Sequence, residues 1–91
     1  MNLGFFTMPI HPPGRSLTET LKEDREFALF ADELGFTEGL FGEHITDAAE
    51  TITSSLIFIA WTLQETKNIK LGTGTVNMPN HHPAMVAAEV A

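Results

Sequence analysis

The chain has 91 residues, of which 43% are hydrophobic, and twelve acidic against five basic residues give it a formal net charge of −7. This length suits one small domain with a marginal core, and the lack of cysteine excludes disulfides, thiolate zinc sites and cysteine nucleophiles. The acidic balance argues against binding to nucleic acid or anionic lipid. The first residues resemble neither a signal peptide nor a membrane span, so we expect a cytoplasmic protein with no membrane contact.

The first predicted element is a strand over residues 2–7, an apolar run that is rich in phenylalanine. A proline-rich loop must follow it, because proline fixes the backbone and donates no hydrogen bond. This loop contains Met8, His11 and Arg15. Loops that follow strands often carry function, so these side chains are candidates for a site.

A helix is predicted from residue 16 to Gly35, since apolar side chains recur along it at intervals of three and four residues. Ser16 and Glu19 have the spacing of a capping box, and Gly35 can adopt the left-handed conformation that ends a helix. Much of the acidity lies in this helix, and we interpret it as a solvated face formed by Glu19, Glu23, Asp24, Glu26, Asp32 and Glu33.

The second unit begins with a predicted strand over residues 36–42. Gly39 and Gly42 would weaken a strand by propensity, so they indicate a tight bend or the close approach of another group. A second helix then follows a polar connection.

This second helix is predicted to begin at a cap supplied by Thr53 or Ser54 and to end near residues 67–68. Leucine and isoleucine dominate its sequence. We interpret its lone tryptophan, Trp61, as a packing residue.

The third unit consists of a strand over residues 69–76 and a helix that begins at Pro83, where proline suits the first turn. Gly72 and Gly74 do not complete a dinucleotide-binding fingerprint. They do permit close approach to the backbone, so a flat group could lie against this strand.

Strand and helix alternate three times along the chain, with connections that are too long for hairpins. Such connections are typical of right-handed parallel crossovers, so we predict an α/β fold with a parallel sheet. Three strands leave both outer edges of the sheet unpaired, and the last helix stops early. We therefore expect a truncated domain that forms homo-oligomers.

Ligands of parallel α/β proteins bind beyond the carboxyl ends of the strands. Three predicted loops meet there, residues 8–15, 43–53 and 77–82, and they hold all four histidines. His44 is the first candidate for acid–base chemistry, because neutral imidazole can accept or deliver a proton near neutral pH. Glu43 is adjacent, but successive strand residues face opposite sides, so the two side chains need not touch.

A metal-dependent hydrolase barrel is an alternative, since imidazole and carboxylate are common zinc ligands. However, His81 and His82 are adjacent rather than four residues apart on a helix, and the first strand has no pair of histidines. We therefore predict that the site holds no metal.

Four segments carry a family resemblance through their order and spacing: LGFF, ADELGF, GEH, and IKLGTGT followed by HP. Over essentially its whole length the chain resembles the bacterial luciferase-like flavin-dependent monooxygenases, in particular the limonene monooxygenase-like branch. The resemblance implies that residues 1–91 are the amino-terminal part of a single TIM-barrel domain and contain its first three strand–helix units.

The resemblance also implies the roles of individual residues. His44 would be the proton-transfer residue, and Glu43 would be the acidic residue near the flavin. The peptide bond Gly74–Thr75 would be cis and would face the flavin, with Phe6 and Met8 beside the ring system. Residues that bind the flavin phosphate would come from later strands.

The cofactor and partners are implied in the same way. Family members use reduced FMN, generally supplied by a separate flavin reductase, and dioxygen to oxidise a small organic substrate. Ile45 stands where luciferases often have a second histidine, so monooxygenation fits better than light emission. A deazaflavin-dependent oxidoreductase and a non-catalytic flavin-binding or structural fragment are the alternatives.

Overall fold

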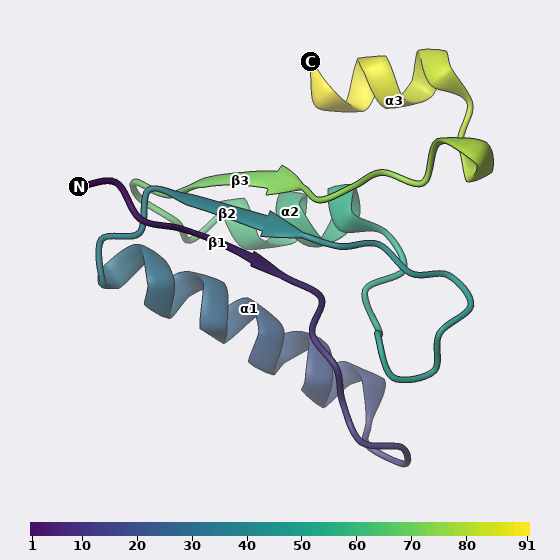
Figure 1. Cartoon of the computed structure of the whole chain (residues 1–91), viewed down its shortest axis with the longest axis horizontal. Helices are drawn as coiled ribbons and strands as arrows, with labels where there is room; N and C mark the ends of the chain where they lie inside the picture. The colour runs from purple at the N-terminus through teal and green to yellow at the C-terminus, as the bar shows by residue number, and fades with distance from the viewer.

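The structure, a computed structural model that describes residues 1–91, is built on a three-stranded parallel sheet (Figure 1). The sheet order is β1-β2-β3, with bounds Gly4–Thr7, Glu38–Phe41 and Lys70–Thr73. Both neighbouring pairs are parallel. The predicted α/β fold and parallel sheet are therefore confirmed, although each strand is shorter than the sequence indicated.

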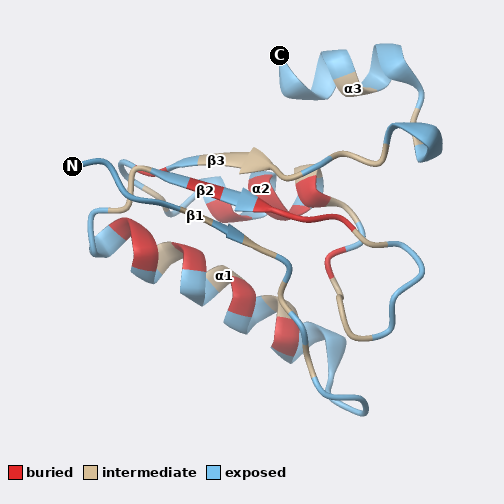
Figure 2. Ribbon diagram, in the orientation of Figure 1, coloured by how far each residue is buried: buried red, intermediate tan, exposed pale blue.

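The helices are α1 (Leu17–Glu33), α2 (Ser55–Leu63), the 3₁₀ helix η1 (Met78–Asn80) and α3 (Pro83–Val90). Helices α1 and α2 pack on the same face of the sheet. Helix α3 stands beyond β3 and has no buried residue (Figure 1, Figure 2). None of these helices is long and apolar enough to span a lipid bilayer.

The core lies between the sheet and helices α1 and α2, where aromatic rings pack against one another. The buried ring of Phe41 lies 5.5 Å from the ring of Phe5 and 4.8 Å from the ring of Phe58, measured between centroids. A Cβ atom on Gly39 would lie only 2.4 Å from Cζ of Phe5. The close approach predicted at Gly39 is therefore confirmed, and the approaching group belongs to the chain itself.

The end of α1 is closed by Gly35, as predicted, and the φ of this glycine is 87°. The Gly35 amide donates to the Asp32 carbonyl at 3.1 Å and the Phe36 amide to the Ala31 carbonyl at 3.0 Å, which is the pattern of a glycine C-cap. The capping box predicted at the other end is wrong, because Ser16 is the N-cap residue but its hydroxyl accepts no hydrogen bond. This first turn is exposed, so water can satisfy its free amides.

Two acidic residues of α1, Asp24 and Asp32, are buried, which corrects the interpretation of its acids as one solvated face. The Asp32 carboxylate accepts hydrogen bonds of 2.5 to 3.0 Å from the amides of Lys67, Asn68 and Ile69. The bond from the Lys67 amide, supported by the other two, outweighs burial and holds the pKa of Asp32 below its ordinary value. These bonds fix the turn before β3, and α2 accordingly ends at Leu63 rather than near residues 67–68.

Helix α2 begins after Ser54, whose hydroxyl accepts a hydrogen bond from the Ile57 amide at 3.4 Å. Of the two predicted caps, Ser54 is therefore the confirmed one. Trp61 packs with its ring edge-on to Phe58, and the Arg25 guanidinium lies 4.8 Å from the centre of the Trp61 ring. The interpretation of this tryptophan as a packing residue is confirmed.

Candidate functional site

The three loops that follow the strands meet at the carboxyl edge of the sheet, as predicted. Ile10 of the first loop pairs with Glu50 of the second loop in a short antiparallel bridge. Asn77 of the third loop donates its amide to the carboxylate of Glu43, which follows β2, at 3.1 Å. The loops therefore support one another and form a single rim.

All four histidines lie on this rim, but they do not form one cluster. Three of them pair with different carboxylates: His11 with Asp24, His44 with Glu50, and His81 with Glu43. His82 accepts a hydrogen bond from the Ala84 amide on its Nδ1 at 3.2 Å, and it therefore caps α3. No group of three or more His, Cys, Asp or Glu residues in the chain could hold a metal ion.

The face of the sheet opposite α1 and α2 is apolar and uncovered, and we call it the open sheet face; it consists of Phe6, Met8, Leu40, Gly72 and Gly74. The exposed fractions of Phe6, Met8 and Leu40 are 54%, 42% and 41%. A Cβ atom on Gly74 would lie 2.8 Å from Cε2 of Phe6, and one on Gly72 would lie 2.8 Å from Cδ2 of Leu40. The glycines thus let side chains of the neighbouring strands extend across β3.

The peptide bond between Gly74 and Thr75 is cis, as predicted. It directly follows the last hydrogen bond of the sheet, in which the Gly74 amide donates to the Phe41 carbonyl at 2.7 Å. Thr75 is exposed. The contact of this bond with a flavin stays a prediction.

Glu43 is buried at the centre of the rim and binds both neighbouring segments of the chain. Its carboxylate accepts hydrogen bonds from the amide and hydroxyl of Ser55 at 3.1 and 3.2 Å, from the Asn77 amide at 3.1 Å and from Nε2 of His81 at 2.8 Å. Its own carbonyl accepts from the side-chain amide of Asn77 at 2.8 Å. Glu43 therefore ties the end of β2 to the start of α2 and to the loop after β3.

Burial acts to raise the pKa of Glu43, but the hydrogen bonds from His81, Asn77 and Ser55 together hold this pKa below its ordinary value. The side chain of Glu43 has no exposed surface. Its predicted role near a flavin stays a prediction, and the structure limits it to an effect through the loop that Glu43 holds.

His44 faces away from Glu43, as the alternation along a strand predicted. Its Nδ1 atom contacts the carboxylate of Glu50, and 35% of its side chain is exposed. A Cβ atom on Gly42 would lie 3.3 Å from Cε1 of His44 and 2.6 Å from Cγ of Met8. The imidazole therefore lies at the margin of the open sheet face, beside Met8.

The third pair fastens the loop after β1 to α1. Nε2 of His11 lies 2.9 and 3.1 Å from the two carboxylate oxygens of Asp24. Burial raises the pKa of Asp24 above its ordinary value, and the hydrogen bond with His11 opposes this shift only in part. Both side chains are largely enclosed, so this pair holds the loop in place.

Sequence reasoning assigned no role at the rim to four residues that the structure places there: Glu50, Ser55, Asn77 and His81. Ser55 and Asn77 lie 12 and 34 residues from Glu43 in the sequence, so no local pattern links them to it. The one available signal was His81, a histidine in a loop already placed on the rim.

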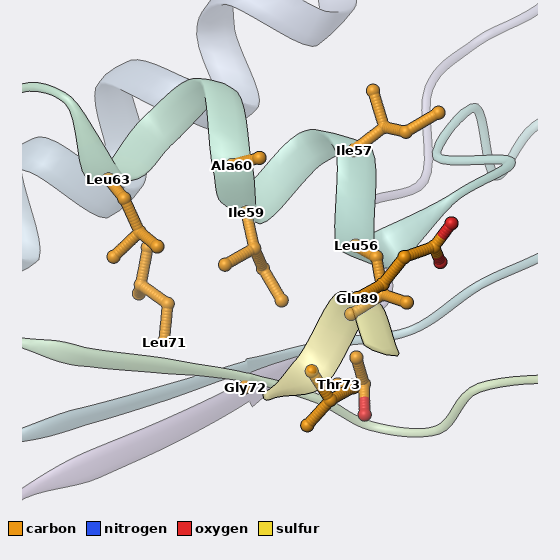
Figure 3. Close-up of a pocket in the computed structure, with 10 residues that line it drawn as sticks. Leu56, Ile57, Ile59, Ala60, Leu63, Leu71, Gly72, Thr73 and Glu89 are labelled. Atoms are coloured by element: carbon orange, nitrogen blue, oxygen red, sulfur yellow. The ribbon is translucent and has the colours of Figure 1, made fainter. Parts of the chain in front are cut away.

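An apolar groove of about 620 Å³ lies on the other side of β3, between α2 and the end of α3 (Figure 3). Side chains of α2, including Ile59 and Leu63, point into it toward Leu71 (Figure 3). Glu89 is the one titratable residue in its lining. Because binding sites combine apolar walls with several convergent polar groups, the rim is the better candidate for chemistry.

A family model described as luciferase-like monooxygenase matches residues 1–91. Curated relatives include 4-hydroxyprotoasukamycin monooxygenase from Streptomyces nodosus subsp. asukaensis, which is 41% identical over 97% of this chain and 24% of that protein. Limonene 1,2-monooxygenase from Rhodococcus erythropolis is 37% identical over 96% of this chain and 22% of that protein. The chain thus spans about a quarter of the length of the curated relatives that it matches.

Solved structures of monooxygenases are also similar to this chain. The oxygenating constituent of 3,6-diketocamphane monooxygenase from Pseudomonas putida, a type II Baeyer–Villiger monooxygenase in complex with FMN, matches 99% of this chain and 25% of its own, with a TM-score of 0.92 and 31% identity. Monooxygenase RslO1 from Streptomyces bottropensis matches 100% of this chain and 28% of its own, with a TM-score of 0.88 and 28% identity. The parallel β/α units are those of a luciferase-like TIM barrel, and with the family match over the whole sequence they show that the chain belongs to the luciferase-like monooxygenase family.

Proposed function

We propose that residues 1–91 form the amino-terminal part of a single TIM-barrel domain in a flavin-dependent monooxygenase. This enzyme uses reduced FMN and dioxygen to oxidise a small organic substrate. The observation that carries the proposal is the similarity to an FMN-bound oxygenating protein, at a TM-score of 0.92 over 99% of the chain. The family match along the whole sequence supports it.

We place the ring system of the flavin at the carboxyl end of the open sheet face, because this face becomes the interior of the barrel and ligands of TIM barrels bind at that end. At this end the half-exposed side chains of Phe6 and Met8 lie beside Gly74 and Gly42, which carry no side chains of their own. Flat heteroaromatic ligands bind to apolar walls with a few polar groups at the margin, and His44 and the Gly74–Thr75 peptide supply such groups. Phe6, Met8, Gly74 and Thr75 would hold the ring system, and Glu43 would act through the loop that it fixes.

Reduced FMN supplies the electrons that activate dioxygen when it is bound, whereas the protein positions the reactants and moves protons. Phe6 and Met8 provide an apolar wall that keeps water from the reacting atoms. His44 accepts or delivers a proton at Nε2, because its Nδ1 is occupied by Glu50. Glu43 keeps the loop after β3 fixed, so the Gly74–Thr75 peptide keeps its place relative to β2.

One basic residue of the rim bears on where the flavin phosphate would bind. Arg15, a basic residue on the rim, is engaged by Glu23 through hydrogen bonds of 2.6 and 2.9 Å, so the flavin phosphate would be bound by other segments of the domain. We further propose that a separate flavin reductase supplies the reduced FMN. We also propose that the enzyme is a homo-oligomer in the cytoplasm.

The proposal is tested on the full-length protein by titration with FMN, followed by oxygen uptake with reduced FMN and with a reduced deazaflavin. We expect FMN to bind and oxygen uptake to depend on reduced FMN. His44→Gln should lower turnover by about 10² to 10⁴-fold with little change in FMN binding, whereas Glu89→Gln, at an exposed position of α3, should change neither. Tight FMN binding without oxygen uptake would show a non-catalytic flavin-binding protein. Activity with the reduced deazaflavin alone would show a deazaflavin-dependent oxidoreductase.

A further inference from the structure

His44 has one polar side-chain partner in the structure, the carboxylate of Glu50. The contact is made by Nδ1 of the imidazole, and the Glu50 side chain is only 16% exposed. The two residues lie on facing segments, because the His44 amide donates to the Ile52 carbonyl at 3.0 Å. The pair is therefore built into the loop after β2 rather than formed by two free surface side chains.

The contact determines which imidazole nitrogen carries the proton. An ionised carboxylate only accepts hydrogen bonds, so the contact requires a proton on Nδ1 of His44. In a neutral imidazole, Nε2 is then the bare acceptor. We propose that Glu50 is a positioning residue for His44, which holds the proton on Nδ1 and directs Nε2 toward a group on the open sheet face. This inference rests on the proposed function for the step in which His44 transfers a proton.

Glu50 is itself held in place by the backbone of the rim. It pairs with Ile10 in the antiparallel bridge, and its amide donates to the Asp47 carboxylate at 3.2 Å. The Ala49 amide donates to the same oxygen at 2.7 Å. The hydrogen bond from Ala49, and after it the one from Glu50, hold the pKa of Asp47 below its ordinary value. The turn is therefore fixed by an ionised carboxylate. Glu50 can therefore orient the imidazole without a rearrangement of the loop.

The position of the ring fits the same role. Cε1 of His44 lies beside Gly42, where any other residue would bring a Cβ atom to 3.3 Å from it and to 2.6 Å from Cγ of Met8. Cε1 is bonded to both ring nitrogens, so a ring with Nδ1 on Glu50 has Nε2 on the far side from that carboxylate. Glycine at position 42 thus leaves room for Met8 and the imidazole to lie next to each other at the margin of the open sheet face.

The test reads the tautomer of His44 directly, by ¹⁵N NMR of the full-length protein labelled at histidine. We expect the Nδ1–H tautomer of His44 in the unaltered protein. In Glu50→Gln the amide can accept or donate, so we expect a mixture of both tautomers. Glu89→Gln is the matched control, because it makes the same substitution at an exposed position of α3, and it should retain the Nδ1–H tautomer.

Kinetics give the second readout. Glu50→Gln should lower kcat at least about tenfold and leave KM and FMN binding nearly unchanged, and Glu50→Asp should restore part of the loss. An unchanged tautomer in Glu50→Gln, or an equal loss of kcat in Glu89→Gln, would overturn the positioning role of Glu50. Full turnover in His44→Gln would instead overturn the proton-transfer role within the proposed function, and the NMR result would still decide what Glu50 does to the imidazole.

Discussion

Two histidine–carboxylate pairs lie on the same rim and start from adjacent residues at the end of β2, yet their surroundings differ. Glu43 points toward the helices, where its enclosed carboxylate accepts hydrogen bonds from His81, Ser55 and Asn77. His44 points the other way and has a single carboxylate partner, with 35% of its side chain exposed. On one side of the strand, protein donors thus occupy the carboxylate of Glu43. On the other side, the imidazole of His44 is open to a ligand.

The difference teaches how one strand end can serve both the fold and the chemistry. A buried carboxylate needs several donors to remain ionised, and those donors must come from neighbouring segments, so Glu43 connects loops. A proton-transfer group needs a free nitrogen near the ligand, so His44 needs few protein partners. The alternation of side chains continues beyond the end of β2 and places the two requirements one residue apart.

The largest expected effect is a difference in stability between variants of the two carboxylates, Glu43 and Glu50. Glu43→Ala leaves buried donors of Ser55, Asn77 and His81 without an acceptor, and it should lower the free energy of unfolding by about 3 kcal/mol or more. Glu50→Ala removes one contact to a partly exposed imidazole and should lower this free energy by about 1 kcal/mol. Urea unfolding of the two full-length variants measures both values under the same conditions.

Equal losses in these two variants would contradict the comparison, because they would show that Glu50 is as strongly integrated into the fold as Glu43. The slope of the free energy against urea should stay the same in both variants. A changed slope would indicate that the unfolding transition itself has changed.

A smaller difference in stability is expected between variants of the two histidines, His81 and His44. His81→Ala deprives the buried Glu43 carboxylate of a donor at 2.8 Å and should cost about 1 to 2 kcal/mol of stability. His44→Ala should cost less than about 0.5 kcal/mol but should abolish the proton-transfer step. Urea unfolding and oxygen uptake on the same preparations measure the predicted changes in stability and in activity. A destabilising His44→Ala with full activity would reverse the assigned roles.

Local patterns in the sequence predict what depends on neighbouring residues. The parallel α/β order, the Gly35 cap, the Ser54 cap and the opposite directions of Glu43 and His44 all follow from periodicity and turn chemistry within a few residues. The capping box fails because its exposed amides do not need side-chain partners. Local pattern alone therefore leaves open whether a possible hydrogen bond forms.

Burial of polar residues depends instead on contacts between distant segments. Asp32 reads as one of several acids on a helix, yet its partners are the amides before β3, more than thirty residues away. The donors to Glu43 likewise come from α2 and from the loop after β3. The candidate site could therefore be located on the rim from sequence, but its network of partners required the packed structure.

The smallest expected effect is on the pH dependence of stability, and it distinguishes a charged Glu43 from a merely hydrogen-bonded one. The pKa of Glu43 lies below its ordinary value of 4.5, so the folded state binds this proton more weakly than the unfolded state does. Its stabilising contribution is therefore complete above 4.5 and is lost as the pH falls through the lower folded value. The loss is smaller than the effect of removing the side chain, because protonation leaves the packing and some hydrogen bonds in place.

Glu43→Gln isolates this contribution from those of Asp32 and Asp47, whose pKa values are also lowered and which remain in both proteins. The variant should be less stable at pH 7, and its stability should fall less steeply than that of the unaltered protein between about pH 5 and pH 3. Urea unfolding of both proteins across this range gives the difference in slope. Parallel curves would show that Glu43 has the same pKa in the folded and unfolded states. In that case the contrast with Glu50 would rest on burial alone, since the hydrogen bonds to Glu43 would favour its two protonation states equally.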